Sequence, residues 1–143
     1  IWESIFEMAD TPGLPDCNPV LWVDKKEKLW LFWIAVRANR WENSMLRYRT
    51  STNYMRKGAP EWGWQDDIIL KPGDTFAEAI HAGFDRYVDE PMWAEYALPY
   101  AKLIVKAAKE PEKRRKGWMT RIHPISLSSG RILLPLYSDG YNV

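Results

Sequence analysis

A strand–turn–strand pattern that occurs twice is the sequence feature that most constrains the fold of this chain. The first copy, residues 18–36, reads NPVLWVDKKEKLWLFWIAV, and the second, residues 121–142, reads RIHPISLSSGRILLPLYSDGYN. Each copy has a polar residue, a proline, a short apolar strand, a tight turn and a longer apolar strand. When the prolines are overlaid, Asn18 falls on His123. The copies lie further apart than the roughly 40 to 50 residues of one four-stranded unit, which predicts an insertion between them.

The first copy belongs to a predicted run of four strands. Residues 20–23 and 29–36 form a hairpin, and residues 45–51 alternate between apolar and charged side chains as a two-faced strand does. Residues 64–70 are a fourth strand. Residues 1–8, IWESIFEM, alternate roughly like a further strand. Four sequential antiparallel strands make one meander.

The insertion, residues 72–116, is predicted to be helical. Thr75 and Glu78 have the spacing of a capping box, and Pro91 suits the first position of a second helix, with a kink at Pro99. The apolar residues of the first helix recur at helical intervals, at Phe76, Ile80, Phe84 and Tyr87. The basic stretch KEPEKRRKG is interpreted as a solvated helix end rather than a nucleic-acid patch.

Composition excludes several classes of partner. A net charge of +1 gives no indication of nucleic acid as a partner, and the sequence has no apolar run of 18 residues that would span a membrane. Two histidines and one cysteine do not supply a zinc set, and there is no glycine-rich phosphate loop, so no metal or cofactor is expected. Cys17 alone cannot form an intrachain disulfide. The compartment stays open, with a secreted or periplasmic location favoured. The 9 tryptophans and 7 tyrosines suit a core and also suit stacking on sugar rings.

Repeated antiparallel meanders favour radial repetition, as in a β-propeller. The stretches CNPVLW, KLWLFW, RYRTSTN and GWMTRIHPISLSSGRILLPLYSDGYN resemble the sialidase-like family of BNR, or Asp-box, repeat propellers. The resemblance implies an all-β fold that is part of a ring of about six blades. On this interpretation residues 1–71 hold the end of one blade and a full second blade. Residues 72–116 are a helical insertion, and residues 117–143 are the first half of a third blade, with the remaining blades outside this chain.

An Asp-box has the pattern Ser-x-Asp-x-Gly-x-x-Thr-Trp at the turn between the third and fourth strands of a blade. The matching place here is Ser51-Thr52-Asn53, followed by Gly58 and by Trp62 or Trp64. Because Asn53 replaces the aspartate and extra residues intervene, this copy is degenerate.

The resemblance also implies a kind of site. Sialidases hold a sugar carboxylate with an arginine cluster and use a tyrosine nucleophile backed by a glutamate, with an aspartate as acid/base. Arginine suits this task because its guanidinium binds carboxylates in bidentate fashion. Arg121 is the one member of such a cluster that can be assigned here. The acid/base aspartate and the Tyr/Glu pair have no assigned positions.

Other candidate site residues come from the predicted channel mouth, where the first strand of each blade begins. Asn18 and His123 are predicted to be equivalent there. His123 is a candidate general acid/base that shares a strand face with Arg121. Tyr137 is a candidate catalytic or wall residue. The remaining candidates for substrate contact are Asp16, Asn18, Trp41 and Asp139, each of which has a purely structural alternative.

Three functions follow as hypotheses. The first is an exo-glycosidase of the sialidase-like type that hydrolyses a terminal acidic sugar. The second is a lyase on uronic-acid polysaccharide, since some sialidase-like propellers use histidine with tyrosine or arginine. The third is a propeller that binds glycans without catalysis. In each case the expected partner is a glycan.

Overall fold

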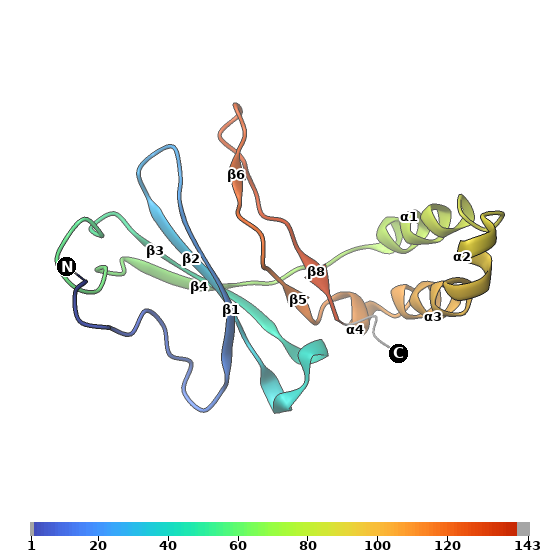
Figure 1. The fold of residues 1–143 in the computed structure, drawn as a ribbon, viewed down its shortest axis with the longest axis horizontal. Coiled ribbons are helices and arrows are strands. Elements are labelled where there is room, and N and C mark those ends of the chain that lie inside the picture. The colour runs from blue at the N-terminus through green and yellow to red at the C-terminus, as the bar shows by residue number, and fades with distance from the viewer. Residues whose placement is uncertain (1, 140–143) are drawn as a thin grey trace.

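The computed structural model describes residues 2–139, so Ile1 and residues 140–143, which include the end of the second copy of the repeat, lie outside the description. A four-stranded antiparallel sheet in the order β1-β2-β3-β4 forms the body of the molecule (Figure 1). The predicted meander is therefore confirmed. Its strands are β1 (Asp16–Val23), β2 (Leu29–Ala35), β3 (Met45–Ser51) and β4 (Trp64–Ile68).

The sheet is covered on both faces around its central strands. On β2 every residue except the half-buried Trp30 is buried, which requires packing above and below the strand. On β3, Leu46 and Thr50 are buried on one face, while Arg47 and Arg49 project from the other. The short helices η1 (Arg37–Asn39) and η2 (Trp41–Asn43) connect β2 to β3.

The second copy of the repeat also forms a hairpin. Strands β6 (Ile125–Ser126) and β7 (Ile132–Leu133) pair antiparallel, and β5 (Trp118–Met119) pairs with β8 (Tyr137–Ser138) beside them. The hairpins β1–β2 and β6–β7 project toward the same side of the molecule in Figure 1. We call them the first and the second hairpin.

The two hairpins have the same turn. In each, the N–H of the first turn residue donates to the carbonyl of the fifth, from Asp24 to Lys28 at 3.0 Å and from Leu127 to Arg131 at 2.8 Å. These equal turns fix which residues correspond between the two hairpins, because pairing proceeds outward from the turn in steps of one residue.

Counting from the turns corrects the overlay made on the prolines. In this count Ile125 matches Trp22 and His123 falls at the position of Val20, so the prediction that Asn18 and His123 are equivalent is wrong. The prolines also differ in environment, since Pro124 is fully buried while Pro19 is exposed. The overlay failed because turn hydrogen bonds and strand pairing set the register, and a proline donates no hydrogen bond to either.

The second hairpin packs on one face of the sheet. Ile132 and Leu134 contact the buried cluster formed by Val20, Trp22 and Phe32 of the first hairpin. Next to this contact, Met119 of β5 completes a second buried cluster with residues of β2 and β3. The two copies of the repeat therefore stack, and their contact forms the main apolar core.

The N-terminal segment lies on the opposite face. Arg49, which projects from that face, donates to the carbonyl of Met8 at 3.0 Å, and the Gly58 N–H donates to the Glu3 carboxylate at 3.0 Å. The strand predicted for residues 1–8 is wrong over the described part, since residues 2–8 form no strand. Alternation in a sequence does not make a strand where no neighbouring strand pairs with it.

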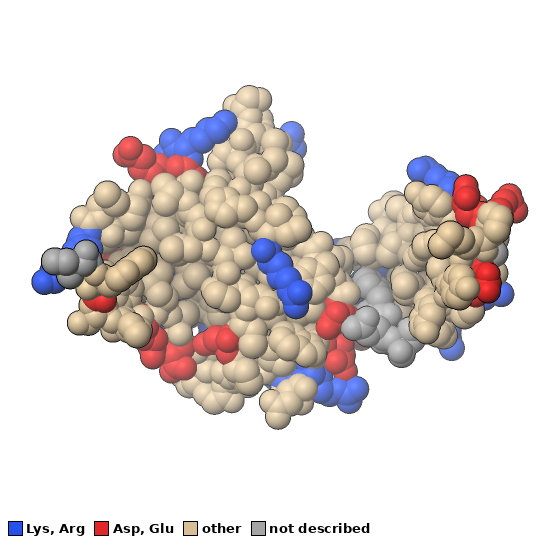
Figure 2. Space-filling view, in the orientation of Figure 1, with Lys and Arg blue, Asp and Glu red and all other residues tan. Residues whose placement is uncertain are grey.

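The predicted helices within residues 72–116 are present and form an arm that extends from the sheet (Figures 1 and 2). Pro91 occupies the first turn of the second helix as expected. The long helix predicted after it divides at Ala97, and Pro99 then lies in the first turn of the third helix. The helices are α1 (Asp74–Asp85), α2 (Pro91–Tyr96), α3 (Leu98–Ala108) and α4 (Pro111–Arg114).

Two details of the arm differ from the sequence prediction. The expected capping box is absent, because α1 begins at Asp74 after Gly73 and no side chain caps it. The basic stretch is not wholly solvated either, since Arg114 is buried. Its guanidinium donates to the Gly73 carbonyl at 2.8 Å and to the Asp74 carboxylate at 2.9 Å. A buried arginine paired in this way joins the end of the arm to its beginning.

The fold is thus β-rich, with one four-stranded antiparallel sheet, two shorter strand pairs and a helical arm. Among residues 2–139 there is no closed ring of blades. The assignment of residues 1–71 and 117–143 to propeller blades, with residues 72–116 as an insertion between them, remains a prediction.

Candidate functional site

Three predicted site residues meet where the two copies of the repeat contact each other. The Asn18 side-chain amide donates to the Tyr137 hydroxyl at 3.0 Å. The Arg121 guanidinium carbon lies 5.4 Å from the centre of the Tyr137 ring, a cation–π contact. Residues 119 positions apart in the chain, Asn18 and Tyr137, are therefore joined by the tertiary structure. We call Asn18, Arg121 and Tyr137 the Arg121 cluster.

Local structure positions each member of the cluster. Asn18 lies in a bulge of β1, where the register shifts between Cys17 and Val20, and has a left-handed φ of 49°. Asparagine tolerates this conformation better than most residues. Tyr137 is held by the pairing of β8 with Met119 in β5. The bulge redirects the Asn18 amide toward the tyrosine, as bulges do near sites.

A small cavity adjoins the cluster. Its volume is ≈290 Å³, and it is lined by Arg121, Ile122, Pro135, Leu136 and Tyr137. Arg121 is exposed, and no carboxylate among residues 2–139 forms an ion pair with it. The exposed Arg121 guanidinium over the Tyr137 ring can bind a carboxylate or sugar hydroxyls.

His123 lies apart from this arrangement. It is exposed, precedes the buried Pro124, and does not line the cavity. Residues 121–123 form no strand, because β6 begins only at Ile125. The argument that Arg121 and His123 share a strand face is therefore wrong. This segment crosses from one strand pair to the other and has no ladder of its own to impose alternation.

Asp16 has a structural environment. One carboxylate oxygen accepts from the Trp33 indole N–H at 3.0 Å, and the other accepts from the Thr11 backbone N–H at 2.6 Å. Trp33 is fully buried, and the guanidinium carbons of Arg47 and Arg49 lie 5.5 and 5.4 Å from the centre of its ring. Asp16 thus satisfies the polar edge of a core tryptophan.

The last two predicted residues lie outside the Arg121 cluster. Trp41 is partly exposed in η2. Its neighbour Glu42 has a lowered pKa, because its own backbone N–H and the side chain of Arg40 favour the carboxylate. Asp139 donates its backbone N–H to the Gly117 carbonyl at 3.0 Å. Neither Trp41 nor Asp139 lines the cavity beside Arg121.

The stretch interpreted as a degenerate Asp-box forms a closed loop between β3 and β4, and its assignment to that motif stays a prediction. Ser51 Oγ donates to the Glu61 carbonyl at 2.6 Å and accepts from the Asn53 N–H at 3.1 Å. Asn53 and Glu61 also form an isolated β-bridge. Gly58 has a φ of 83°, a conformation that glycine adopts without strain. This loop is structural and lies apart from the Arg121 cluster.

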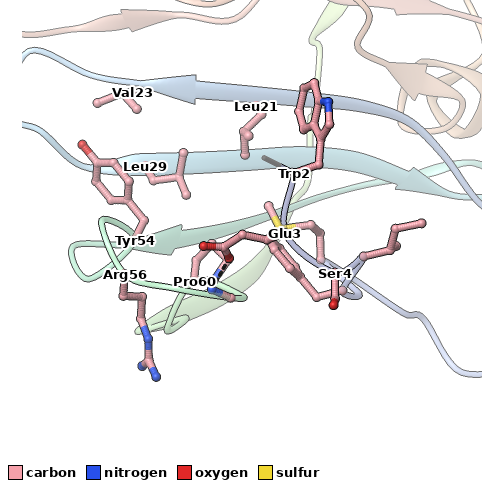
Figure 3. Close-up of a pocket in the computed structure, with 13 residues that line it drawn as sticks. Trp2, Glu3, Ser4, Leu21, Val23, Leu29, Tyr54, Arg56 and Pro60 are labelled. Atoms are coloured by element: carbon pink, nitrogen blue, oxygen red, sulfur yellow. Dashed lines mark hydrogen bonds between the residues drawn. The ribbon is translucent and has the colours of Figure 1, made fainter.

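A larger groove of ≈780 Å³ lies between the N-terminal segment and the first hairpin (Figure 3). Trp2, Leu21, Val23 and Leu29 give it a mainly apolar lining, and the Glu3 carboxylate accepts the hydrogen bond from the Gly58 N–H within the groove. The groove lies on the sheet face opposite the second hairpin. It shares no lining residue with the cavity beside Arg121.

Sequence reasoning missed a further pocket of ≈490 Å³ between the β2–β3 connection and the start of β5, lined in part by Arg37, Ser44 and Lys116. The residues that form it are distant in sequence and share no motif, so only the tertiary structure brings them together.

The described residues contain no group of three or more His, Cys, Asp or Glu side chains placed to hold a metal ion. None of the helices within residues 2–139 has the length and apolar character needed to cross a membrane. Basic and acidic side chains are interspersed on the face shown in Figure 2.

Comparisons of the chain with protein-family models, with curated proteins and with solved structures found no match.

Proposed function

We propose that this chain is part of a sialidase-like β-propeller that binds glycans ending in an acidic sugar and hydrolyses them as an exo-glycosidase. The observation that carries the proposal is the convergence of Arg121, Tyr137 and Asn18 beside a cavity. A site for a charged sugar needs a cation and a ring or hydroxyl close together, and this cluster contains both.

The stacking of the two hairpins supports the propeller. The second hairpin presents Ile132 and Leu134 to the first, and these residues correspond to Leu29 and Leu31 when counted from the turns. One face of a repeat therefore packs on the other face of its neighbour. Repeated packing of this kind generates a ring of blades.

The chemistry assigned to the cluster follows from its groups. Arg121 holds the sugar carboxylate through its planar guanidinium. Tyr137 presents a hydroxyl held by Asn18, and a tyrosine nucleophile avoids the repulsion that a carboxylate nucleophile would meet next to an anionic sugar. His123 was expected to transfer the proton, but it lies apart from the cluster and does not line the cavity, so the proposal assigns it no role in the reaction.

Binding without catalysis is the second candidate, and one observation favours it. The hydroxyl of Tyr137 contacts an amide, and no Asp or Glu within residues 2–139 hydrogen-bonds to it. A tyrosine nucleophile of the sialidase type depends on such a carboxylate. A chain with the cluster alone would therefore bind acidic sugars and leave them intact.

The test combines binding and turnover on one protein. We expect N-acetylneuraminic acid to perturb the NMR signals of the Arg121 cluster, and neutral galactose to leave them unchanged. Arg121→Lys keeps the charge but loses the planar fork, and should weaken binding on the order of 10-fold. The matched control is Arg40→Lys, since Arg40 is an exposed arginine already paired with Glu42.

Turnover separates the candidates. With a fluorogenic sialoside as substrate, hydrolysis that is lost in Tyr137→Phe supports the exo-glycosidase, while binding without hydrolysis supports the glycan-binding protein. An unsaturated, ultraviolet-absorbing product from a uronic-acid polysaccharide would instead indicate the lyase. If Arg121→Lys binds as tightly as the unaltered protein, the cluster is structural and the proposal fails.

A further inference from the structure

The pocket between the β2–β3 connection and the start of β5 has the properties of a second binding site. It is separate from the cavity beside Arg121, with which it shares no lining residue. Residues of η1 and η2 form one wall, and the chain that follows α4 forms the other. The residues that bear on its chemistry are Arg37, Asn43, Ser44, Arg115 and Lys116.

The pocket carries uncompensated positive charge. Neither Arg37 nor Lys116 forms an ion pair with another residue in the described part of the chain. Arg115 has one exposed contact, 3.5 Å from Glu112, of a kind that contributes little. The acidic residue of the lining, Asp67, is already paired with Arg47 at 2.7 Å. The lining therefore favours an anion.

A buried hydroxyl without a partner lies in the same wall. Ser44 is buried, its backbone N–H donates to the Trp41 carbonyl, and its side-chain oxygen has no hydrogen-bond partner among residues 2–139. Buried hydroxyls in proteins are almost always hydrogen-bonded, and because Ser44 is among the residues that line the pocket, rotation of its hydroxyl toward the pocket would allow it to donate to a bound anion. The amide of Asn43 is the adjacent donor.

The backbone of this wall is strained as well. Ala38 and Asn39 both have left-handed φ values, 54° and 53°. Alanine rarely adopts this conformation, whereas asparagine tolerates it, so the strain lies at Ala38. Strain of this kind is concentrated at ligand-binding sites. Here it follows Arg37 directly in the chain.

We propose that this pocket binds an oxyanion group, with Arg37, Arg115 and Lys116 supplying the charge and Ser44 and Asn43 supplying neutral donors. Guanidinium and ammonium groups together with hydroxyl and amide donors suit sulfate, phosphate or carboxylate. The inference is independent of the proposed function, because no residue of the Arg121 cluster takes part.

The experiment is a titration of the protein with sodium sulfate, inorganic phosphate and glucuronate, each at low ionic strength and followed by NMR. We expect saturable shifts in the pocket for at least one of the three. A tetrahedral anion that binds most tightly indicates a sulfated or phosphorylated ligand. Glucuronate that binds most tightly indicates a carboxylated one. Arg37→Ala and Lys116→Ala should each weaken binding about 10-fold.

Two controls isolate the pocket from general electrostatics. Arg40→Ala removes a cation from the same connection but outside the pocket, and Arg121→Ala removes the cation of the other site. Both should leave the affinity of the pocket unchanged. If Arg40→Ala weakens binding as much as Arg37→Ala, or if none of the three anions saturates, the proposal is overturned.

Ser44→Ala provides a readout that a merely structural role would not give. Without anion, the variant should be as stable as the unaltered protein or more stable, because an unpaired buried hydroxyl has been removed. Its anion affinity should nevertheless fall. A variant that binds the anion with unchanged affinity would show that Ser44 does not contact it and would contradict the assignment.

Discussion

The first and second hairpins have the same turn and different surroundings. Trp22 of the first hairpin is 8% exposed, whereas Ile125, which corresponds to it in the second, is 55% exposed. Trp30 is half-buried, and its counterpart Leu133 is exposed. The second hairpin covers the face of the first hairpin that carries Trp22 and Trp30. No described segment covers the corresponding face of the second hairpin. The comparison shows that local sequence determines the turn, while the neighbouring element determines burial.

The largest expected effect uses two leucines at corresponding positions. Leu31 is buried in β2, and Leu134, which corresponds to it, is only half-buried. We expect Leu31→Ala to lower the free energy of unfolding by about 2–5 kcal/mol, because a buried leucine leaves a cavity. Leu134→Ala should cost roughly half as much, since less apolar surface is lost from the core. Urea denaturation measures both.

Leu133→Ala is the control for that pair. Leu133 is 48% exposed, so the loss should be the smallest of the three, about 0.5 kcal/mol. Equal losses in the free energy of unfolding for Leu31→Ala and Leu134→Ala would mean that the two hairpins are equally buried in solution. That result would contradict the difference between them.

An intermediate effect is expected at the fourth residue of each turn. Glu27 has a φ of 57° and Gly130 a φ of 79°, so both backbones are left-handed. A Cβ at Gly130 meets no atom within 4 Å, so Gly130→Ala should cost about 1 kcal/mol from backbone strain alone. Glu27→Gly should raise the free energy of unfolding by about 0.5 kcal/mol, as relief of strain is partly offset by the entropy of the unfolded glycine.

Thermal unfolding of the two variants would test this equivalence. A loss of stability in Gly130→Ala together with a gain in Glu27→Gly would sharpen the comparison, because it would show that both turns have the same backbone in solution. A Gly130→Ala variant as stable as the unaltered protein would show that the second turn has a different conformation.

The smallest effect concerns pH and separates the two turns. Partial burial tends to raise the pKa of Asp24. Hydrogen bonds from the Trp30 indole and from the Lys28 and Lys26 backbone N–H groups, with the Lys28 charge, outweigh burial and lower the pKa. Because the folded pKa is below the unfolded one, this carboxylate stabilises the protein above pH about 4 and loses that contribution as pH falls through the folded pKa.

Asp24→Asn should therefore reduce stability at pH 7, and the difference from the unaltered protein should shrink in acid. Guanidinium denaturation at pH 7 and pH 3 measures it. Leu127 has the corresponding position in the second turn, so Leu127→Ala should show no such pH dependence. A constant difference for Asp24→Asn would mean that the carboxylate is not held as described.

Much of the fold was predictable from local pattern. The strands 29–36 and 45–51 were found within a residue of their observed ends, since alternation and β-branched or aromatic residues act locally. Pro91 at the start of a helix and the break near Pro99 follow from the fixed backbone of proline. The loop over residues 52–63 was predicted from its turn-forming residues, whereas its assignment as an Asp-box stays a prediction.

The sequence predicted which residues belong to the candidate site but not how they contact one another. Arg121, Tyr137 and Asn18 were each identified from the sequence, yet nothing in the sequence indicated that Asn18 donates to Tyr137. The assignment of His123 to the same strand face as Arg121 failed, because alternation requires a paired strand and this segment has none.

The sequence by itself determined the elements of this protein: two turns, the strands that flank them and the helices between them, all of which depend on residues close together in the chain. The tertiary structure alone decided that His123 does not correspond to Asn18, that residues 2–8 form no strand, and that Arg37, Ser44 and Lys116 share a pocket. Those outcomes depend on which surfaces meet, and the contacts that fix them join residues far apart in the chain.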